Sequence, residues 1–160
     1  MEIKRQMDPK KKKIIQAAAG VLIFLLVAVF TGFIVNYAQK SARDTQRLSD
    51  IAGLRFDLEL FYHKYDKFPL AVLTAKKEDK EACSDNLCLD YVPADPLSGA
   101  AYAYTPCADP ENVNCGENIG RPLSYMLIYT LETDSIGLFP GNHFASPKGV
   151  CADPSCLPAR

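Results

Sequence analysis

Six cysteines are the residues whose type and spacing bear most directly on chemistry in this 160-residue chain. All lie beyond position 82, in three close pairs: Cys83 with Cys88, Cys107 with Cys115, and Cys151 with Cys156. Spacing alone does not select among the connectivities open to six thiols, but we expect neighbours to bond because each pair brackets one short surface loop. Zinc is the weaker alternative, because C-x4-C and C-x7-C spacings without a nearby histidine differ from structural zinc sites.

The two histidines do not predict a catalytic group. His63 lies within a helical pattern and His143 within a stretch without clear periodicity, so we expect both at the surface or its boundary. The chain has no phosphate-binding glycine motif and no H-E-x-x-H sequence. Asp134 and Ser135 could offer hard oxygen ligands to calcium, although a turn there would use the same residues. We therefore predict a non-enzymatic protein without catalytic, cofactor or metal residues, and leave calcium near Asp134 open.

Residues 17–35 form the most apolar stretch of the chain. These 19 residues carry no charge, and only Thr31 is polar. As a helix they would reach roughly 28 Å, the thickness of the hydrocarbon layer of a membrane. A buried core helix is disfavoured because the remaining chain is too small to cover so long an apolar rod, and a cleaved signal usually has a shorter apolar run. We expect a retained transmembrane helix.

The charge distribution predicts how this helix is oriented. Residues 1–13 carry a net charge of +4, with lysine at every position from 10 to 13, and the rest of the chain carries −5. Cationic flanks stay in the cytoplasm, so the part after the helix should lie outside, where its cysteines can be oxidised. The acidic bulk also argues against nucleic acid as a partner.

A second, amphipathic stretch follows without a proline, so we predict one helix over residues 14–65 that ends at Lys67-Phe68-Pro69. Its apolar positions recur in steps of three and four: Leu48, Ile51, Leu54, Leu58, Phe61, Tyr62 and Tyr65. The charged residues between them are expected to form a solvated face: Arg43, Asp44, Arg47, Asp50, Arg55, Asp57, Glu59 and Lys64.

The remainder predicts a small antiparallel sheet. Residues 101–104 and 124–132 have strand-like composition. One face of the second segment should pack on the apolar stripe of the helix: Tyr125, Leu127, Tyr129 and Leu131. Residues 76–90 read as a charged loop, and residues 134–160 as an irregular tail because proline and glycine are frequent there.

The predicted fold class is therefore α+β, with a long N-terminal transmembrane-plus-amphipathic helix packed on a small antiparallel sheet and an irregular, disulfide-braced C-terminal tail. We expect a basic cytoplasmic arm (1–13), a transmembrane helix (14–37) and an extracytoplasmic head (38–160). Within the head we expect a helix (38–66), loops and sheet (67–133) and the tail (134–160).

Small residues in the apolar stretch suggest how copies of the chain would meet. Ala28 and Gly32 lie four residues apart on one helix face, a spacing that permits close helix approach in lipid. The expected partners are the membrane and further copies or similar subunits. The residues expected to pack are Ala28, Gly32, Leu48, Ile51, Leu54, Leu58 and Phe61.

The order of these features resembles that of type IV pilin-like proteins, especially the major pseudopilin of type II secretion systems. The motifs that carry the resemblance are Ser41-Ala42-Arg43-Asp44-x-x-Arg47, Lys67-Phe68-Pro69, Tyr91-Val92-Pro93-Ala94-Asp95-Pro96-Leu97-Ser98-Gly99, a Tyr-x-Tyr strand and Tyr125-x-x-x-Tyr129-x-Leu131-Glu132. The resemblance implies a pilin-like fold. It also implies subunits in the bacterial inner membrane that polymerise through their apolar helices, with the heads outside.

The chain departs from this family before the apolar stretch. Family members carry a Gly-Phe-Thr-Leu-Ile-Glu-type processing site there, whereas Lys13 is followed by Ile14-Ile15-Gln16, and the early glutamate of the mature helix is missing. The alternative is therefore a permanently anchored extracytoplasmic binding module that does not polymerise.

Overall fold

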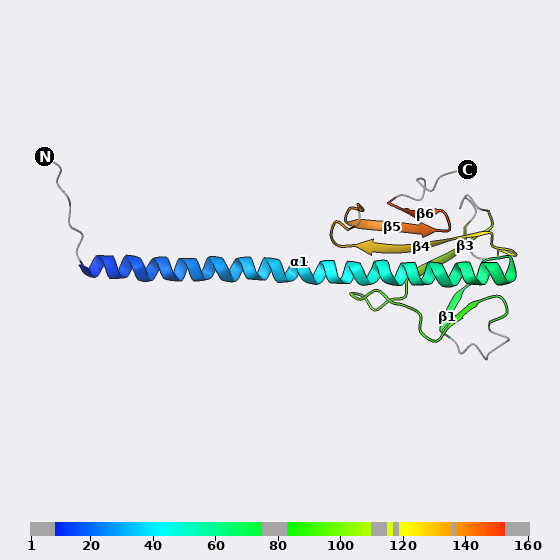
Figure 1. Cartoon of the computed structure of the whole chain (residues 1–160), viewed down its shortest axis with the longest axis horizontal. Coiled ribbons are helices and arrows are strands. Elements are labelled where there is room, and N and C mark those ends of the chain that lie inside the picture. The colour runs from blue at the N-terminus through cyan, green and yellow to red at the C-terminus, as the bar shows by residue number, and fades with distance from the viewer. Residues whose placement is uncertain (1–8, 75–82, 110–114, 117–118, 136, 153–160) are drawn as a thin grey trace. The chain divides into compact units, whose positions relative to one another are not determined.

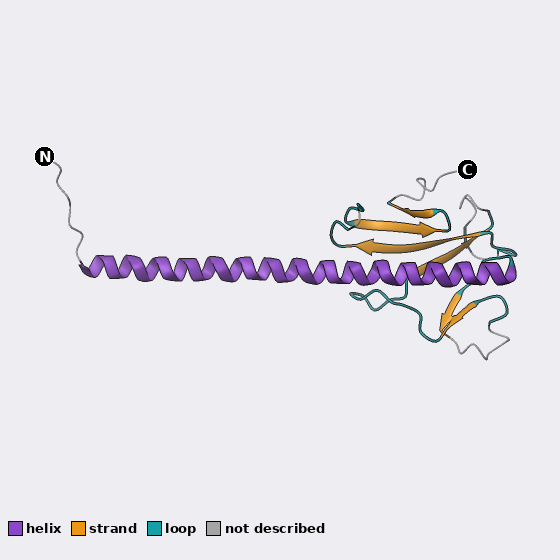
Figure 2. Cartoon of the chain, viewed as in Figure 1, coloured by secondary structure: helices purple, strands orange, loops and turns teal. Residues whose placement is uncertain are grey.

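The structure is a computed structural model that describes residues 9–74, 83–109, 115–116, 119–135 and 137–152. Its elements appear in Figures 1 and 2 and follow the order α1 (Pro9–Tyr65), β1 (Val72–Thr74), β2 (Leu87–Leu89), β3 (Ala103–Cys107), β4 (Ser124–Leu131), β5 (Gly141–Ser146) and β6 (Gly149–Cys151). The chain divides into two units. We call residues 1–39 the N-terminal unit and residues 40–160 the head.

Helix α1 begins and ends at sequence signals. It starts at Pro9, five residues before the predicted start; proline is tolerated at this position because the first N–H groups of a helix have no intrahelical acceptor. It ends at Tyr65, as predicted. Asp66 then takes a left-handed conformation, with φ of 54°, and its N–H donates to the Tyr62 carbonyl at 2.8 Å. Phe68 follows and is buried in the core.

The four-stranded antiparallel sheet has the order β3-β4-β5-β6. Strand β4 confirms the strand predicted over residues 124–132. The face predicted to pack on the helix is almost fully buried, and it forms one core with four residues of α1. The sheet contributes Tyr125, Leu127, Tyr129 and Leu131, and the helix contributes Ile51, Leu54, Leu58 and Phe61. The predicted α+β packing is therefore confirmed.

Strand β3 lies later in the chain than predicted. The prediction placed a strand over residues 101–104, but Ala101 pairs with Ala94 in an isolated bridge, and β3 runs from Ala103 to Cys107. Its register against β4 includes Pro106, opposite Tyr125. Proline is accommodated because β3 lies at the sheet edge, where one side of the strand needs no ladder hydrogen bonds.

The prediction of an irregular tail over residues 134–160 was wrong for its middle part. Strand β5 pairs with β4, and β6 pairs with β5. The sequence of β5, Gly-Asn-His-Phe-Ala-Ser, contains few residues that favour strands. Its conformation is set by pairing with the central strand, which is a tertiary effect.

A second sheet contains two parallel strands, β1 and β2, with Val72 opposite Leu87. Figure 1 shows this pair and the four-stranded sheet on opposite sides of the head part of α1. The prediction of a loop over residues 76–90 was therefore wrong for β2. Leu87 is buried and Val72 is partly buried against the core, so packing fixes this short pair.

The disulfide pairings predicted from sequence proximity are confirmed for the two described pairs. Cys83 bonds to Cys88, and Cys107 bonds to Cys115. Cys156 and the side chain of Cys151 lie outside the described residues, so the third pair stays a prediction.

Candidate functional site: the outward faces of the long helix

The N-terminal unit exposes its apolar side chains. α1 contains an 18-residue window with a mean hydropathy of 2.8 and no buried residue, and the helix is long and apolar enough to cross a membrane. The large apolar side chains exposed here are Val21, Leu22, Ile23, Phe24, Leu25, Leu26, Val27, Val29, Phe30, Phe33, Ile34 and Val35. An exposed apolar surface of this extent marks a site that lipid or another protein covers.

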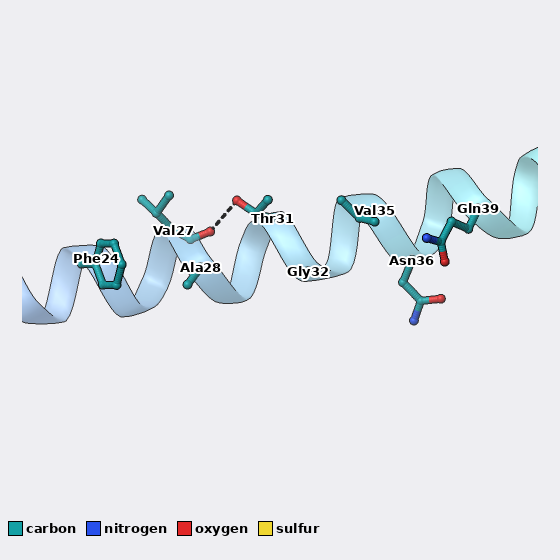
Figure 3. A pocket seen from close by; sticks show the side chains of 8 residues that line it. All are labelled: Phe24, Val27, Ala28, Thr31, Gly32, Val35, Asn36 and Gln39. Carbon is teal, nitrogen blue, oxygen red and sulfur yellow. Dashed lines mark hydrogen bonds between the residues drawn. The ribbon is translucent and has the colours of Figure 1, made fainter.

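One side of this unit carries an open groove, shown in Figure 3. It is lined by Phe24, Val27, Ala28, Thr31, Gly32, Val35, Asn36 and Gln39. The Thr31 hydroxyl donates to the Val27 carbonyl at 2.8 Å, so this polar group is satisfied within the helix. A Cβ atom added at Gly32 would meet no atom within 4 Å. The predicted packing residues Ala28 and Gly32 therefore leave room for close approach by another helix.

The other predicted packing residues lie inside the head. Ile51, Leu54, Leu58 and Phe61 are buried in the head core, and Leu48 is partly buried against it. The four buried side chains hold α1 to the sheets of the same chain, so they are not available to a neighbouring molecule while the head is folded.

The outward face of α1 in the head differs from the charged face that the sequence predicted. Every exposed residue between positions 42 and 60 is uncharged. They are Ala42, Thr45, Gln46, Ser49, Ala52, Gly53, Phe56 and Leu60. Phe56 and Leu60, one turn apart, are 65% and 51% exposed. We call these eight residues the uncharged face.

Between positions 43 and 59 the charges of this helix are instead buried or half-buried, so the prediction of a solvated charged face was wrong there. It was right for Lys64, which is exposed. Asp44 is 0% and Arg47 2% exposed. Asp50, Arg55 and Asp57 are half-buried along the borders of the uncharged face.

Three charges of the helix belong to a cluster that the sequence prediction missed. The charge cluster comprises Arg43, Asp44, Arg47, Asp95 and Glu132. Arg43 binds both carboxylate oxygens of Glu132, each at 2.7 Å. Arg47 donates to Asp95 at 2.5 Å and to Asp44 and Glu132 at 2.8 Å each. The cluster joins α1 to the turn after residue 94 and to the end of β4.

Asp44 is also the acceptor for the chain that follows β4. Its carboxylate accepts the N–H of Glu132 at 3.0 Å and the N–H and hydroxyl of Thr133 at 2.8 and 2.7 Å. The carboxylate therefore satisfies two backbone donors that would otherwise be buried without partners.

The cluster keeps its acids ionised. Hydrogen bonds from Arg43, opposed by burial and assisted by Arg47, lower the pKa of Glu132 to about 2. The Arg47 hydrogen bond lowers the pKa of Asp95 well below its usual range. Burial alone would raise the pKa of Asp44, but hydrogen bonds from Glu132, Thr133 and Arg47 outweigh it and lower that pKa. We call the charge cluster the clamp, because its ionised groups hold α1 to the turn after residue 94 and to the end of β4.

Asp95 also organises the turn that follows it. Its second carboxylate oxygen accepts the N–H groups of Leu97 and Ser98 at 3.0 and 2.8 Å. Gly99 closes the turn with φ of 70°, a left-handed conformation that favours glycine, and donates to the Asp95 carbonyl at 2.8 Å. The Asp-Pro-x-x-Gly motif is therefore a turn that presents a carboxylate to Arg47.

The histidines have different environments. His63 is exposed, as predicted. The prediction was wrong for His143, which is 1% exposed because β5 turns alternate side chains inward. Its Nε2 lies 2.7 Å from the Phe139 carbonyl, and its ring packs on Tyr129.

Ser135 and Leu138 exchange backbone hydrogen bonds of 3.0 and 2.9 Å, and Asp134, which precedes them, is exposed. In the described ranges, no group of three or more histidine, cysteine or acidic side chains could hold a metal ion. Calcium near Asp134 stays open.

Comparisons with protein-family models, with curated proteins and with solved structures found no match to this chain. The architecture itself, a long N-terminal apolar helix with an antiparallel sheet packed on it, is consistent with a pilin-like fold. The apolar helix and the two disulfides suggest a membrane-anchored or secreted extracytoplasmic protein.

Proposed function

We propose that this chain is a non-enzymatic, membrane-anchored subunit of the pilin or pseudopilin kind. It assembles through α1, with further copies or with similar subunits, into a filament of the type IV pilus or type II secretion type. The observation that carries the proposal is the uncharged face of α1, which the described residues of the head leave exposed.

A helix face that serves only to meet water is normally rich in charged and polar residues, whereas only three residues of this face are polar, Thr45, Gln46 and Ser49. Here no exposed residue between positions 42 and 60 is charged, and the face includes two large apolar side chains, Phe56 and Leu60. Covering Phe56 and Leu60 by a neighbouring subunit would stabilise association by about 1.5–3 kcal/mol for each side chain fully buried. Ala52 and Gly53 beside them would let a neighbouring backbone approach closely.

The proposed location is the bacterial inner membrane, with the N-terminus in the cytoplasm and the head outside. The lysines at positions 10–13 support this orientation because cationic flanks are retained in the cytoplasm. The disulfides of the head support an extracytoplasmic location, because such bonds persist in oxidising compartments.

A second candidate function is a permanently anchored binding module that does not polymerise. The sequence Lys13-Ile14-Ile15-Gln16 favours it, because this segment lacks a pilin-type processing site and the early glutamate. In this case the lipid alone would cover the N-terminal unit, and each molecule would remain a monomer.

Photo-crosslinking from the uncharged face separates the two candidates. A benzophenone amino acid would replace Phe56 in the full chain, expressed in bacterial membranes, and adducts would be measured on denaturing gels. The matched control places the same probe at Tyr91, which is 71% exposed but lies outside α1. We expect a ladder of subunit multiples from position 56 and little from position 91. Monomer alone at both positions would reject assembly and leave the anchored module.

The N-terminal sequence of the mature protein adds an independent measurement. Loss of the basic arm would support processing and assembly, and an intact Met1 on a protein that stays monomeric in detergent would support the second candidate.

A further inference from the structure

Four charged residues along the borders of the uncharged face form no ion pair within the described part of the chain. They are Arg55, Asp57, Glu59 and Lys64. The first three are half-buried, and Lys64 is exposed. By contrast, every member of the charge cluster is paired within the head. The four border charges are therefore open to a neighbouring molecule.

Arg55 and Glu59 lie on the same side of α1, because they are four residues apart, which is about one helical turn. Burial raises the pKa of Tyr125 in β4 to about 12, and Arg55 opposes this rise whereas Glu59 adds to it. Both charges therefore lie near that hydroxyl. The Nε of Arg55 is buried without a hydrogen-bond partner among the described residues. This side, which we call the β4 border, carries a cation followed by an acid.

Asp57 and Lys64 lie on the opposite side of the uncharged face. Asp57 comes two positions before Glu59, and two helical positions are separated by about 200° around the axis. Asp57 and Lys64 both line an open groove, to which Leu87 and Leu89 of β2 also contribute. This side, which we call the β2 border, carries an acid followed by a cation.

The two borders complement each other when the α1 helices of two copies lie side by side in the same direction. Copies anchored by the same apolar stretch enter a membrane in the same direction. Two parallel helices whose uncharged faces meet bring opposite borders together, as the flanking charges of parallel coiled coils do. In two level helices, Arg55 lies about 3 Å along the axis from Asp57 of the other copy, and Glu59 about 8 Å from Lys64. A small axial shift between the copies brings both pairs within reach of their long side chains.

We propose that the α1 helices of neighbouring copies pack in parallel through the uncharged face, with Glu59 of one copy bound to Lys64 of the next and Arg55 bound to Asp57. The occupant of this face is thus a second copy of the chain. Because the paired borders differ, each copy carries both halves of the contact, and the contact can repeat from copy to copy as an open assembly requires. This inference rests on the proposed function and adds to it the charges that select the neighbour.

The test reverses one charge at a time and measures the contact with the benzophenone probe at position 56 of the full chain in bacterial membranes. Glu59→Lys opposes two cations in each contact, and Lys64→Glu opposes two acids. Each variant alone should lower the yield of crosslinked multimers by about three- to tenfold, because an attraction between partly exposed charges becomes a repulsion.

Co-expression of the two variants gives a result that a folding defect could not produce. The Glu59→Lys copy then meets the Lys64→Glu copy through opposite charges at both borders, so mixed multimers should return to the wild-type yield. Different epitope tags on the two copies identify the mixed adducts. As a matched control, Asp90→Lys makes the same change of charge as Glu59→Lys at an exposed position outside α1, and it should leave the yield unchanged.

The possible results separate the border pairing from the proposed function. Absence of multimers from the wild type would reject assembly itself, and the border pairing with it. Wild-type multimers whose yield is unchanged in both variants, or falls equally in Asp90→Lys, would overturn the border pairing and leave assembly standing. Loss in both variants without recovery on co-expression would also overturn it, because Glu59 and Lys64 would then not be each other's partners.

Discussion

Asp44 and Arg47 hold charged groups at positions of α1 that face the core. They continue the spacing of three and four that leads to Ile51, Leu54 and Leu58, so helix geometry places them on the buried side. Burying charges is costly unless geometry and hydrogen bonding are nearly complete. Here each of the two charges has several hydrogen-bond partners. Removing either charge would therefore lower the free energy of unfolding of the head.

Replacing Asp44 by alanine should therefore strongly destabilise the head. The change leaves Arg47 with one fewer acceptor and the N–H groups of Glu132 and Thr133 unpaired. We expect the free energy of unfolding to fall by about 3–5 kcal/mol, measured by urea denaturation of the full chain in detergent. Asp57→Ala is the matched control on the same helix and should change it by less than about 0.5 kcal/mol. Equal losses in both variants would contradict the clamp.

The charge cluster also predicts how stability depends on pH. The pKa of Glu132 is lowered from 4.5 to about 2, so the contribution of its ionised form is complete above pH 4.5 and is lost as the pH falls through about 2. The urea midpoint of the wild type should fall across this window. Glu132→Gln should lower the midpoint at neutral pH and flatten the fall, whereas Glu59→Gln, outside the cluster, should retain the wild-type profile. An unchanged slope in Glu132→Gln would be inconsistent with this assignment.

Two tyrosine hydroxyls should respond in opposite ways to the same substitution. The Tyr129 hydroxyl is buried without a hydrogen-bond partner among the described residues, and burial raises its pKa to about 12. The Tyr104 hydroxyl donates to the Pro69 carbonyl at 2.6 Å. Tyr129→Phe should leave the free energy of unfolding unchanged or raise it by about 1 kcal/mol, and Tyr104→Phe should lower it by about 1 kcal/mol. Urea denaturation measures both, and a loss in Tyr129→Phe would indicate that its hydroxyl is paired.

At the scale of elements, predictions from sequence succeeded where one segment carried the full pattern. The amphipathic half of α1 shows apolar residues in steps of three and four, and β4 alternates Tyr125, Leu127, Tyr129 and Leu131 with outward-facing residues. Both patterns can be read from one segment of the sequence. The apolar face of α1 and the apolar face of β4 are then buried against each other. The two confirmed disulfides were predictable for the same reason, since their partners are close in the chain.

The elements that were missed depend on distant partners. Strand β5 has weak intrinsic preference and is ordered by its ladder with β4, and β1 and β2 pair across residues 75–86. The uncharged face of α1 was missed because the charged residues were assigned to solvent by type. Their helical positions, in register with Ile51 and Leu54, were the available signal for the buried Asp44 and Arg47.

The disulfides should stabilise these loop-rich elements. The disulfide joins Cys83, which precedes β2, to Cys88 within β2. In the chain-entropy model, a disulfide that closes so short a loop stabilises the folded state by about 2–3 kcal/mol. Cys83→Ala combined with Cys88→Ala should lower the free energy of unfolding by that amount. Reductant should then destabilise the double variant less than it destabilises the wild type. Equal sensitivity to reductant would show that this bond does not contribute.

At the scale of the whole molecule, the features that stabilise the fold and the apolar stretch lie in different units. The described core, both described disulfides and the charge cluster all lie within the head, whereas the N-terminal unit contributes no residue to the core. Folding of the head should therefore be independent of the first 39 residues. Membrane association should depend on them entirely, because they contain the apolar stretch.

A fragment of residues 40–160 should consequently remain in solution after membranes are sedimented, and should unfold at the same urea midpoint as the head of the full chain in detergent. The control fragment, residues 53–160, lacks Asp44, Arg47 and Ile51 and should not fold, because it loses the clamp and part of the core together. Near-ultraviolet circular dichroism of the buried tyrosines would follow both. A large drop in midpoint for the longer fragment would mean that the apolar part of α1 supports the head, and the separation of anchoring from folding would then fail.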